Sequence, residues 1–214
     1  MNPYENPRVV REMAKPRGLY KSEEWFFHQV ISDSESVLEV GCGTQGIVRS
    51  AMTFGHGWRP YMGVDSSEAM IAEIKRIDHY RPELYRVADA TDLPFEMNSF
   101  DSTIAFGVIH QIPEWRRAIL EMYRVARKYC LFDVRLSSNT ALDEETCKQH
   151  VVHKDYGTVP YIVVNIANFF ASLKSLKPTP QIEFYGYNHK LADTVSGVTT
   201  DAFMTAILLK KPEL

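Results

Sequence analysis

The sequence predicts an α/β fold: a doubly wound, seven-stranded, mostly parallel sheet with an antiparallel last strand. Short apolar runs alternate with segments of helical periodicity along most of the chain, which is typical of a parallel sheet with helices on both faces. A glycine-rich turn follows the first apolar run, at the strand end where such sheets bind ligands. Because the length of 214 residues suits one full core, we expect residues 1–214 to form a single domain.

The composition and charge of the chain limit the classes of partner that we expect. Hydrophobic residues make up 45% of the chain and charged residues 24%, as in ordinary globular proteins. The net charge of −3 argues against a broad phosphate-binding surface, because nucleic-acid-binding proteins usually carry a basic excess. Three scattered cysteines suit a reducing compartment, and no uncharged apolar run reaches the ~18 residues of a membrane helix. With no apolar leader core at the start, we expect a cytoplasmic protein with no nucleic-acid or membrane partner.

The strands are expected where apolar, β-branched or aromatic residues lie between turn residues. Their ranges are 36–40, 60–65, 83–89, 101–107, 129–136, 182–187 and 203–211. Apolar positions at helical spacing predict helices over 66–77, where Ser66 or Ser67 supplies an N-cap, over 113–128, and over 163–176, which ends before Pro178. Strands and helices in this order fit one doubly wound sheet.

Two segments fall outside this alternation. Residues 1–35 precede the first strand and hold two helical patterns, over 7–14 and 22–31. Residues 137–160 lie between the fifth strand and the next helix. Because ligands bind beyond the carboxyl ends of parallel strands, we expect an N-terminal helical cap (1–35) and a lid (137–160) to roof the site and select the substrate.

The turn "GCGTQG" (41–46) after the first strand has the spacing G-x-G-x-x-G. Glycines permit a tight turn, and a helix that follows offers free N–H groups to an anion. Asp65 closes the second strand, a little beyond the ~20 residues expected for an acid that binds a ribose. The pattern suits an adenosine compound, but it does not distinguish a nicotinamide cofactor from other adenosine compounds. A tight turn that binds no ligand can have the same sequence pattern.

Glu39 favours one of these ligands. It stands two residues before the first glycine, near the non-nucleoside end of the ligand, where a pyrophosphate would repel it. S-adenosylmethionine (SAM) has no phosphate and carries an ammonium and a sulfonium, which suit a carboxylate. The chain also contains neither a Tyr-x-x-x-Lys dyad nor a G-x-x-x-x-G-K-[ST] phosphate loop. Glu39 either contacts the cofactor or only orients the turn.

Three segments taken together resemble the class I SAM-dependent methyltransferases: "VLEVGCGTQG" (37–46), "GVDSSEAM" (63–70) and "VADATDLPFEMNSFDSTIAFGVIHQIPEW" (87–115). The closest group is the small-molecule type with D-x-x-x-LPF and then SFD between the third and fourth strands. The resemblance runs from about Val37 to Arg127, under half the chain. It implies a Rossmann-like methyltransferase fold and SAM as the cofactor.

The resemblance also implies which residues bind the cofactor. These are Glu39, Gly41, Cys42, Gly43, Asp65, Ser66, Met70, Asp89, Ala90, Phe106, Gly107 and Val108. The first four would line the methionine end, Asp65 would accept the ribose hydroxyls, and Asp89 the adenine amino group. The alternative is that Asp65 and Asp89 are ordinary turn residues at strand ends and that Phe106 is a residue of the hydrophobic core.

Two departures from the family pattern stand out. Such enzymes often have Gly-x-Gly-x-Gly, whereas Gln45 here delays the third glycine to Gly46, so Gly46 is not among the expected contacts. The glycine-rich turn usual before the fifth strand is also missing. That turn would lie away from the cofactor, so we expect no effect on the chemistry.

SAM carries its own activated methyl group, so the protein must chiefly align an acceptor with it. His110 follows the fourth strand just past the expected cofactor floor and is the candidate base or acceptor-orienting group, because an imidazole takes up protons near neutral pH. A packing or helix-capping role is equally open. Gln111 either binds the acceptor or is a loop residue.

Several aromatic residues and a cysteine–histidine segment are further candidates for the site. Trp25, Trp115, Tyr4 and Tyr20 can wall or close the site, although core or surface positions are commoner for such residues. Cys147, His150 and His153 have a spacing that can lie on one helical face, and these residue types bind zinc. Because no fourth ligand is evident, we predict a metal-free lid helix with His150 or His153 as an alternative base.

The absence of two motifs narrows the class of methyl acceptor. The fourth strand ends in "FGVIHQIPE" rather than the Asn-Pro-Pro-Tyr type of motif found in amino-methylating nucleic-acid enzymes, and no Pro-Cys occurs. We therefore expect a small-molecule acceptor, with an apolar or aromatic one favoured by the aromatic residues of the cap and lid. A SAM-binding partner protein without turnover is the main alternative function, and a nicotinamide-linked oxidoreductase is a weaker one.

Overall fold

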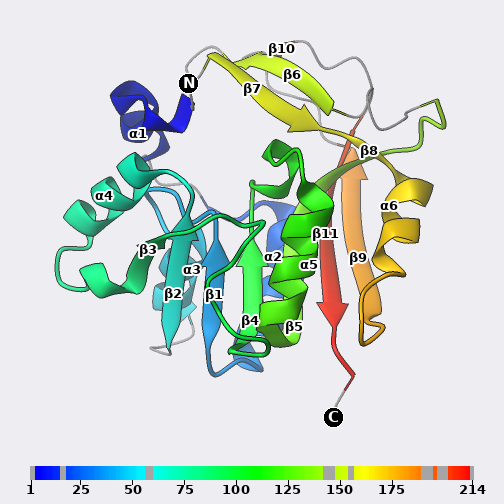
Figure 1. Cartoon of the computed structure of the whole chain (residues 1–214), viewed down its shortest axis with the longest axis horizontal. Helices are drawn as coiled ribbons and strands as arrows, with labels where there is room; N and C mark the ends of the chain where they lie inside the picture. Colours follow the sequence, from blue (N-terminus) through cyan, green and yellow to red (C-terminus); the bar gives the residue numbers. More distant parts are fainter. Residues whose placement is uncertain are drawn as a thin grey trace.

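The computed structural model describes residues 3–14, 18–55, 60–141, 148–153, 157–188, 195–196 and 202–212. Its main sheet has the order β3-β2-β1-β4-β5-β11-β9, with the short β8 also paired to β5 (Figure 1). Neighbours from β3 to β5 are parallel, whereas β11 is antiparallel to both β5 and β9. The predicted mostly parallel sheet with an antiparallel last strand is confirmed.

The observed strand bounds follow the predicted ranges closely. They are β1 Val37–Val40, β2 Tyr61–Asp65, β3 Tyr85–Val87, β4 Phe100–Ala105, β5 Ala126–Ser137, β8 Val164–Asn165, β9 Gln181–Asn188 and β11 Phe203–Lys210. β3 is shorter than the predicted 83–89, because Pro82–Leu84 form a 3₁₀ turn before it and Asp89 begins a turn after it. β5 begins where the helix over 113–128 was expected to continue, since Ala126 already pairs with Phe100 of β4.

Helices cover both faces of the sheet and bury two apolar clusters against it. Their bounds are α1 Pro7–Met13, α2 Lys21–Ser32, α3 Ile47–Gly55, α4 Glu68–Ile77, α5 Trp115–Val125 and α6 Ile166–Leu173. α5 and α6 pack against one face, where Phe132 joins their cluster. α2, α3 and α4 lie on the other face around Leu131 (Figure 1). Burying side chains such as these contributes about 1.5–3 kcal/mol each to folding.

The N-cap predicted for α4 is confirmed at Ser67, whose Oγ accepts a hydrogen bond from Met70 N at 3.1 Å. Asn165 caps α6 in the same way, with Oδ1 accepting from Asn168 N at 3.1 Å. These bonds satisfy N–H groups that have no partner inside the helix. The two helices are thereby fixed at the carboxyl ends of β2 and β8.

The lid segment is a sheet and not the predicted helix. β6 (Lys148–His153) pairs antiparallel with β7 (Gly157–Ile162), and β10 (Val195–Ser196) pairs with β6. This small sheet lies above the carboxyl ends of the main strands (Figure 1). The helical prediction was wrong because β-branched residues such as Val151 and Val152 favour strands, and β7 supplies a partner along the full length of β6. Cys147 lies outside the described residues.

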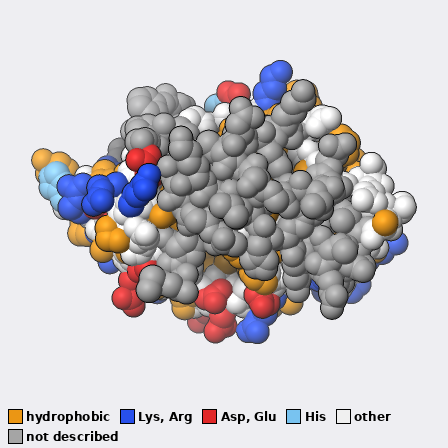
Figure 2. Space-filling model, turned by 90° about the horizontal axis from the view of Figure 1, so that it is seen from above, with side chains coloured by type: hydrophobic (Ala, Val, Ile, Leu, Met, Phe, Trp, Pro, Cys, Tyr) orange, Lys and Arg blue, Asp and Glu red, His pale blue; other side chains and the backbone are white. Residues whose placement is uncertain are grey.

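Two features of the described residues concern possible partners: the charges on the surface and the length and polarity of the helices. Seen from above, the Lys and Arg side chains of the described part of that face gather mainly at its left, and the Asp and Glu side chains mainly along its lower edge (Figure 2). This part shows no extended basic stripe of the type that binds phosphate backbones. Among the described residues, none of the helices is both long enough and apolar enough to span a bilayer.

Candidate functional site

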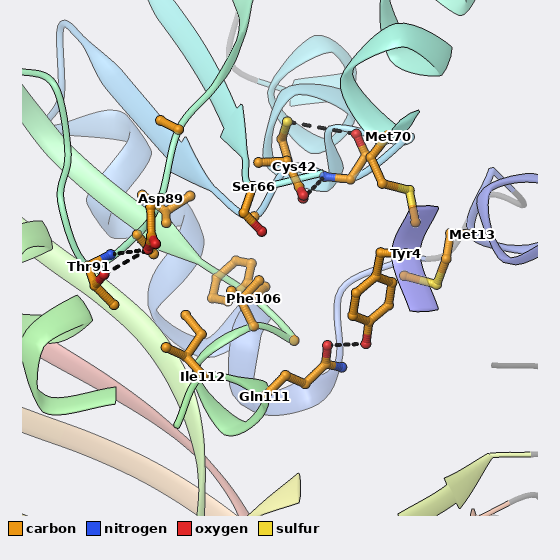
Figure 3. Close-up of a pocket in the computed structure, with 18 of the residues that line it drawn as sticks. Tyr4, Met13, Cys42, Ser66, Met70, Asp89, Thr91, Phe106, Gln111 and Ile112 are labelled. Carbon is orange, nitrogen blue, oxygen red and sulfur yellow. Dashed lines mark hydrogen bonds between the residues drawn. The ribbon is translucent and has the colours of Figure 1, made fainter. Parts of the chain in front are cut away.

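A cavity of about 450 Å³ opens at the carboxyl ends of β1, β2, β3 and β4. Eleven of the twelve predicted cofactor-binding residues line it: Gly41, Cys42, Gly43, Asp65, Ser66, Met70, Asp89, Ala90, Phe106, Gly107 and Val108. Figure 3 labels Cys42, Ser66, Met70, Asp89 and Phe106 among them. Residues from four strand ends, up to 67 positions apart in sequence, therefore surround a single space. Their roles in binding a ligand stay predictions.

The glycine turn needs its glycines for two different reasons. Gly41 has φ +73°, and a Cβ there would come within 2.2 Å of Val108 Cγ2 on the neighbouring strand end. Gly43 has φ +53°, but a Cβ there would meet no heavy atom within 4 Å. Such values of φ are strained for any residue with a side chain. Gly41 thus allows the turn to pack against the floor, and Gly43 presents backbone to open cavity space.

Asp65 closes β2 and fixes two backbone segments with its carboxylate. Oδ2 accepts a hydrogen bond from Gly43 N at 3.0 Å, and Oδ1 accepts one from Ser67 N at 2.9 Å. Burial raises the pKa of the Asp65 carboxyl, although these N–H groups oppose that shift. The side chain therefore links the glycine turn to the start of α4 and keeps an acidic group in the cavity wall.

Asp89 follows β3, the strand next to β2, and lies across the cavity from Tyr4 and Met13 (Figure 3). Its Oδ1 accepts hydrogen bonds from both Thr91 N and Thr91 Oγ1, each at 2.8 Å. This Asx turn aims the side chain and ends the strand. Within the described chain, neither bond uses Oδ2, so that oxygen can accept a donor from a ligand.

Glu39 lies beneath the glycine turn and is not among the described residues that line the cavity. It is 3% exposed, with Oε1 accepting from Val48 N at 3.2 Å and Oε2 accepting from the Tyr61 hydroxyl at 2.5 Å. Proximity to this carboxylate and burial raise the pKa of Tyr61, burial being the larger cause. Both carboxylate oxygens thus accept hydrogen bonds from the chain itself, and a contact of Glu39 with a cofactor stays a prediction.

The floor of the cavity continues β4 through Phe106, Gly107 and Val108. Gly107 has φ +76°, and its N–H donates to Asp133 Oδ1 at 2.5 Å. Asp133 is completely buried on β5, and sequence reasoning missed it. The available signal was a pair of charged residues, Asp133 and Arg135, inside the otherwise apolar second half of the strand, Cys130–Leu136.

His110 is buried behind the floor, with 7% of its surface exposed, and is not among the described lining residues. Its ring lies 5.1 Å from that of Tyr161 on β7 in an edge-to-face arrangement. The next residue, Gln111, does line the cavity. The structure thus places His110 beside the lining residue Gln111 but not among the described residues that line the cavity.

The N-terminal cap forms a further wall of the cavity. Tyr4 and Met13 line the cavity, and the Tyr4 hydroxyl donates to Gln111 Oε1 across it (Figure 3). The Gln45 side-chain amide donates to Met13 O at 2.5 Å, and Ser67 Oγ donates to Tyr4 O at 2.9 Å. The sequence suggested Tyr4 as a closing residue, but the contacts of Met13 and Gln45 were missed because they join segments distant in sequence.

The remaining aromatic candidates lie elsewhere among the described residues. Trp115 is 2% exposed and packs on Phe169 in the core. Trp25 is 63% exposed and stacks on Tyr185 with ring centroids 4.3 Å apart. Tyr20 stands at the N-cap of α2. In the described ranges, no group of three or more His, Cys, Asp or Glu residues is arranged to hold a metal.

The sequence of residues 38–132 matches a family model described as a methyltransferase domain. Over 106 residues the chain is 33% identical to demethylmenaquinone methyltransferase of Listeria welshimeri, covering 45% of this chain and 42% of that protein. Over 100 residues it is 37% identical to phthiotriol/phenolphthiotriol dimycocerosates methyltransferase of Mycobacterium tuberculosis, covering 46% and 36%. The chain thus spans less than half the length of these two relatives.

The fold itself matches solved structures along nearly the whole chain. A SAM-dependent methyltransferase from Methanosarcina mazei superposes with a TM-score of 0.65 at 16% identity, covering 91% of this chain and 99% of that one. At this identity the likeness concerns the fold. The resemblance to class I SAM-dependent methyltransferases, drawn from the sequence, is confirmed.

Proposed function

We propose that this chain, which has the class I SAM-dependent methyltransferase fold, transfers the methyl group of SAM to a small-molecule acceptor. The observation that carries the proposal is the convergence of a glycine turn and two strand-end acids, Asp65 and Asp89, on one cavity. SAM, when bound, supplies an electrophilic methyl group on a sulfonium leaving group. Every other contribution described below comes from residues of the chain.

The residues present fit SAM. At Gly43 the backbone faces open cavity space, so a ligand can approach it closely. Asp65 offers a carboxylate to two neighbouring hydroxyls, and Asp89 offers Oδ2 to an amino group. Phe106 and Met70 supply apolar surface for an adenine ring. Glu39, buried under the turn, adds a negative charge that favours the cationic end of SAM.

The acceptor is proposed to enter on the side walled by Tyr4, Gln111, Ile112 and Pro160. Most of this wall is apolar, which suits an apolar or aromatic small molecule, and both named relatives act on small-molecule acceptors according to their names. The cap already lies over this space through the Tyr4–Gln111 contact, which excludes water and helps to hold the acceptor in line with the methyl group. His110 is proposed as a positioning residue behind Gln111 and not as a base in contact with the acceptor.

Calorimetric titration with S-adenosylhomocysteine (SAH), SAM and NAD tests the cofactor assignment. We expect wild type to bind SAH and SAM, and Asp65→Asn to weaken SAH binding by about 10–100-fold, because a hydrogen bond to a charged group contributes about 1.5–3 kcal/mol. Asp92→Asn is the matched control, since Asp92 is exposed near the cavity but is not among its described lining residues. Tight binding of NAD without any response to SAH would contradict the proposal.

A second experiment tests whether the protein transfers the methyl group. Incubating the protein with methyl-labelled SAM and small-molecule extracts should yield a labelled product, whose identification gives the acceptor. If SAH binds and no labelled product forms in any extract, the chain is a SAM-binding protein without turnover.

A further inference from the structure

Two charged side chains lie buried on β5, directly behind the cavity. Asp133 and Arg135 are two residues apart on a strand, so both point to the face that α2 covers. They are 0% and 6% exposed, and Arg135 Nη1 lies 2.5 Å from Asp133 Oδ2. Neither is among the described residues that line the cavity. Since desolvating such a pair costs free energy that two apolar residues avoid, its presence calls for a role other than stability.

Each partner of the pair holds one wall of the cavity. On the floor side, Asp133 Oδ1 accepts a hydrogen bond from the N–H of Gly107, a lining residue with positive φ. On the roof side, Arg135 Nε donates to the Tyr161 hydroxyl at 3.2 Å. Tyr161 lies on β7, and the residue before it, Pro160, lines the cavity. A continuous chain of polar contacts therefore runs from floor to roof outside the cavity.

We propose that the Asp133–Arg135 ion pair is a positioning pair: it sets the separation of the floor at Gly107 and the roof strand β7, and with it the fit of the ligand between them. The identity of that ligand rests on the proposed function, whereas the link itself does not. β7 and β6 pair along their full length, so fixing Tyr161 also fixes the small sheet that lies over the main strands (Figure 1).

The charges around the pair keep it ionised. Burial alone would raise the pKa of the Asp133 carboxyl, but Arg135, His110 and the Gly107 N–H together hold that pKa below its usual range. The Asp133 charge raises the pKa of Arg135 in turn, against the effect of burial. At neutral pH both groups are charged, so the link is present under ordinary conditions.

Tyr161→Phe tests the link with the smallest change, because it removes the hydroxyl and keeps the ring. Hydrogen exchange of the unliganded protein should become faster both in β7 and at the Gly107 amide, and the Kd for SAH should rise by about 10-fold. Tyr123→Phe is the matched control. Its hydroxyl donates to Pro178 O at 2.7 Å, away from the described cavity lining, so Tm should fall while SAH affinity and Gly107 exchange stay at wild-type values.

A second variant tests the link at its charged partner. Asp133→Asn retains an acceptor for Gly107 and removes the charge that holds Arg135, so exchange in β7 should rise. Faster exchange in β7 with unchanged exchange at Gly107 in Tyr161→Phe, or a fall in Tm with the SAH-induced Tm shift unchanged, would overturn the link. A wild-type protein that does not bind SAH would contradict the proposed function instead, and the exchange measurements would still decide on the link.

Discussion

At the scale of single residues, the carboxylates of the cavity wall already hold backbone groups before any ligand is considered. Asp65 accepts from Gly43 N and Ser67 N, and Asp89 accepts twice from Thr91. These bonds fix the direction of each acid without a ligand, which reduces the ordering that binding must supply. A replacement at either position therefore changes both the shape of the wall and its chemistry.

Adding a side chain at Gly41 should weaken ligand binding. In Gly41→Ala the new Cβ meets Val108 Cγ2 at 2.2 Å, and φ +73° adds about 1–2 kcal/mol of strain, so the turn and the floor must move apart. We expect the Kd for SAH to rise by about 10-fold or more. Gly18→Ala is the control, because its Cβ would meet no heavy atom within 4 Å and its φ is ordinary. Equal SAH affinities of the two variants would contradict the prediction.

At the scale of elements, the cap and the main sheet meet through a few polar contacts. The Gln45–Met13 bond joins the glycine turn to the end of α1, and the Tyr4–Gln111 bond joins the first 3₁₀ turn (Pro3–Glu5) to the segment after β4. Both bonds lie at the cavity wall. The departure of Gln45 from the family's glycine pattern is thus matched by a contact that the cap uses.

Replacing Gln45 tests whether the cap contributes to binding. Gln45→Ala removes a hydrogen bond of about 1 kcal/mol, so SAH should bind about fivefold more weakly, with the change mainly in the dissociation rate. Stopped-flow or surface-binding kinetics measure this. Gln29→Ala, at an exposed position on α2, should bind SAH as wild type does, and a wild-type dissociation rate in Gln45→Ala would rule out a contribution of this contact.

Asp101 fixes the opposite end of the sheet and gives a prediction on pH. Burial would raise the pKa of its carboxyl, but Glu35 N at 2.8 Å and Arg127 Nε at 2.6 Å outweigh this and hold the pKa below its usual range. Because the folded state then binds its proton more weakly than the unfolded state, the carboxylate stabilises the fold above the unfolded pKa of about 4. That stability is lost as pH falls through the lower folded pKa.

We therefore expect Asp101→Asn to lower the free energy of unfolding by about 1–3 kcal/mol at pH 7, which is about 2–12 °C in Tm for a chain of this size. The difference from wild type should shrink as pH falls below about 4. Thermal unfolding of both proteins from pH 7 to pH 3 measures it. A Tm difference that is constant over this range would show that the charge of Asp101 is not its cause.

At the scale of the whole molecule, the cavity belongs to no single element. Four strand ends supply the acids, the glycine turn and the floor, the cap adds Tyr4 and Met13, and the roof strand β7 adds Pro160. The sheet order places the four strand ends side by side, and the small sheet lies above them (Figure 1). Under the proposed function, we expect acceptor selection to depend on the cap and the roof together, and cofactor binding to depend on the strand ends.

The sequence by itself determined the alternation of strands and helices, the glycine turn and the acids at two strand ends. These are local patterns, in which hydrophobic period and turn chemistry act within a few residues. The small sheet of β6, β7 and β10, the contacts of Gln45 and the burial of His110 were decided only by the tertiary structure. Each depends on which distant segment lies beside it, as with the Asp133–Arg135 pair between Gly107 and Tyr161, and no local pattern encodes that neighbour.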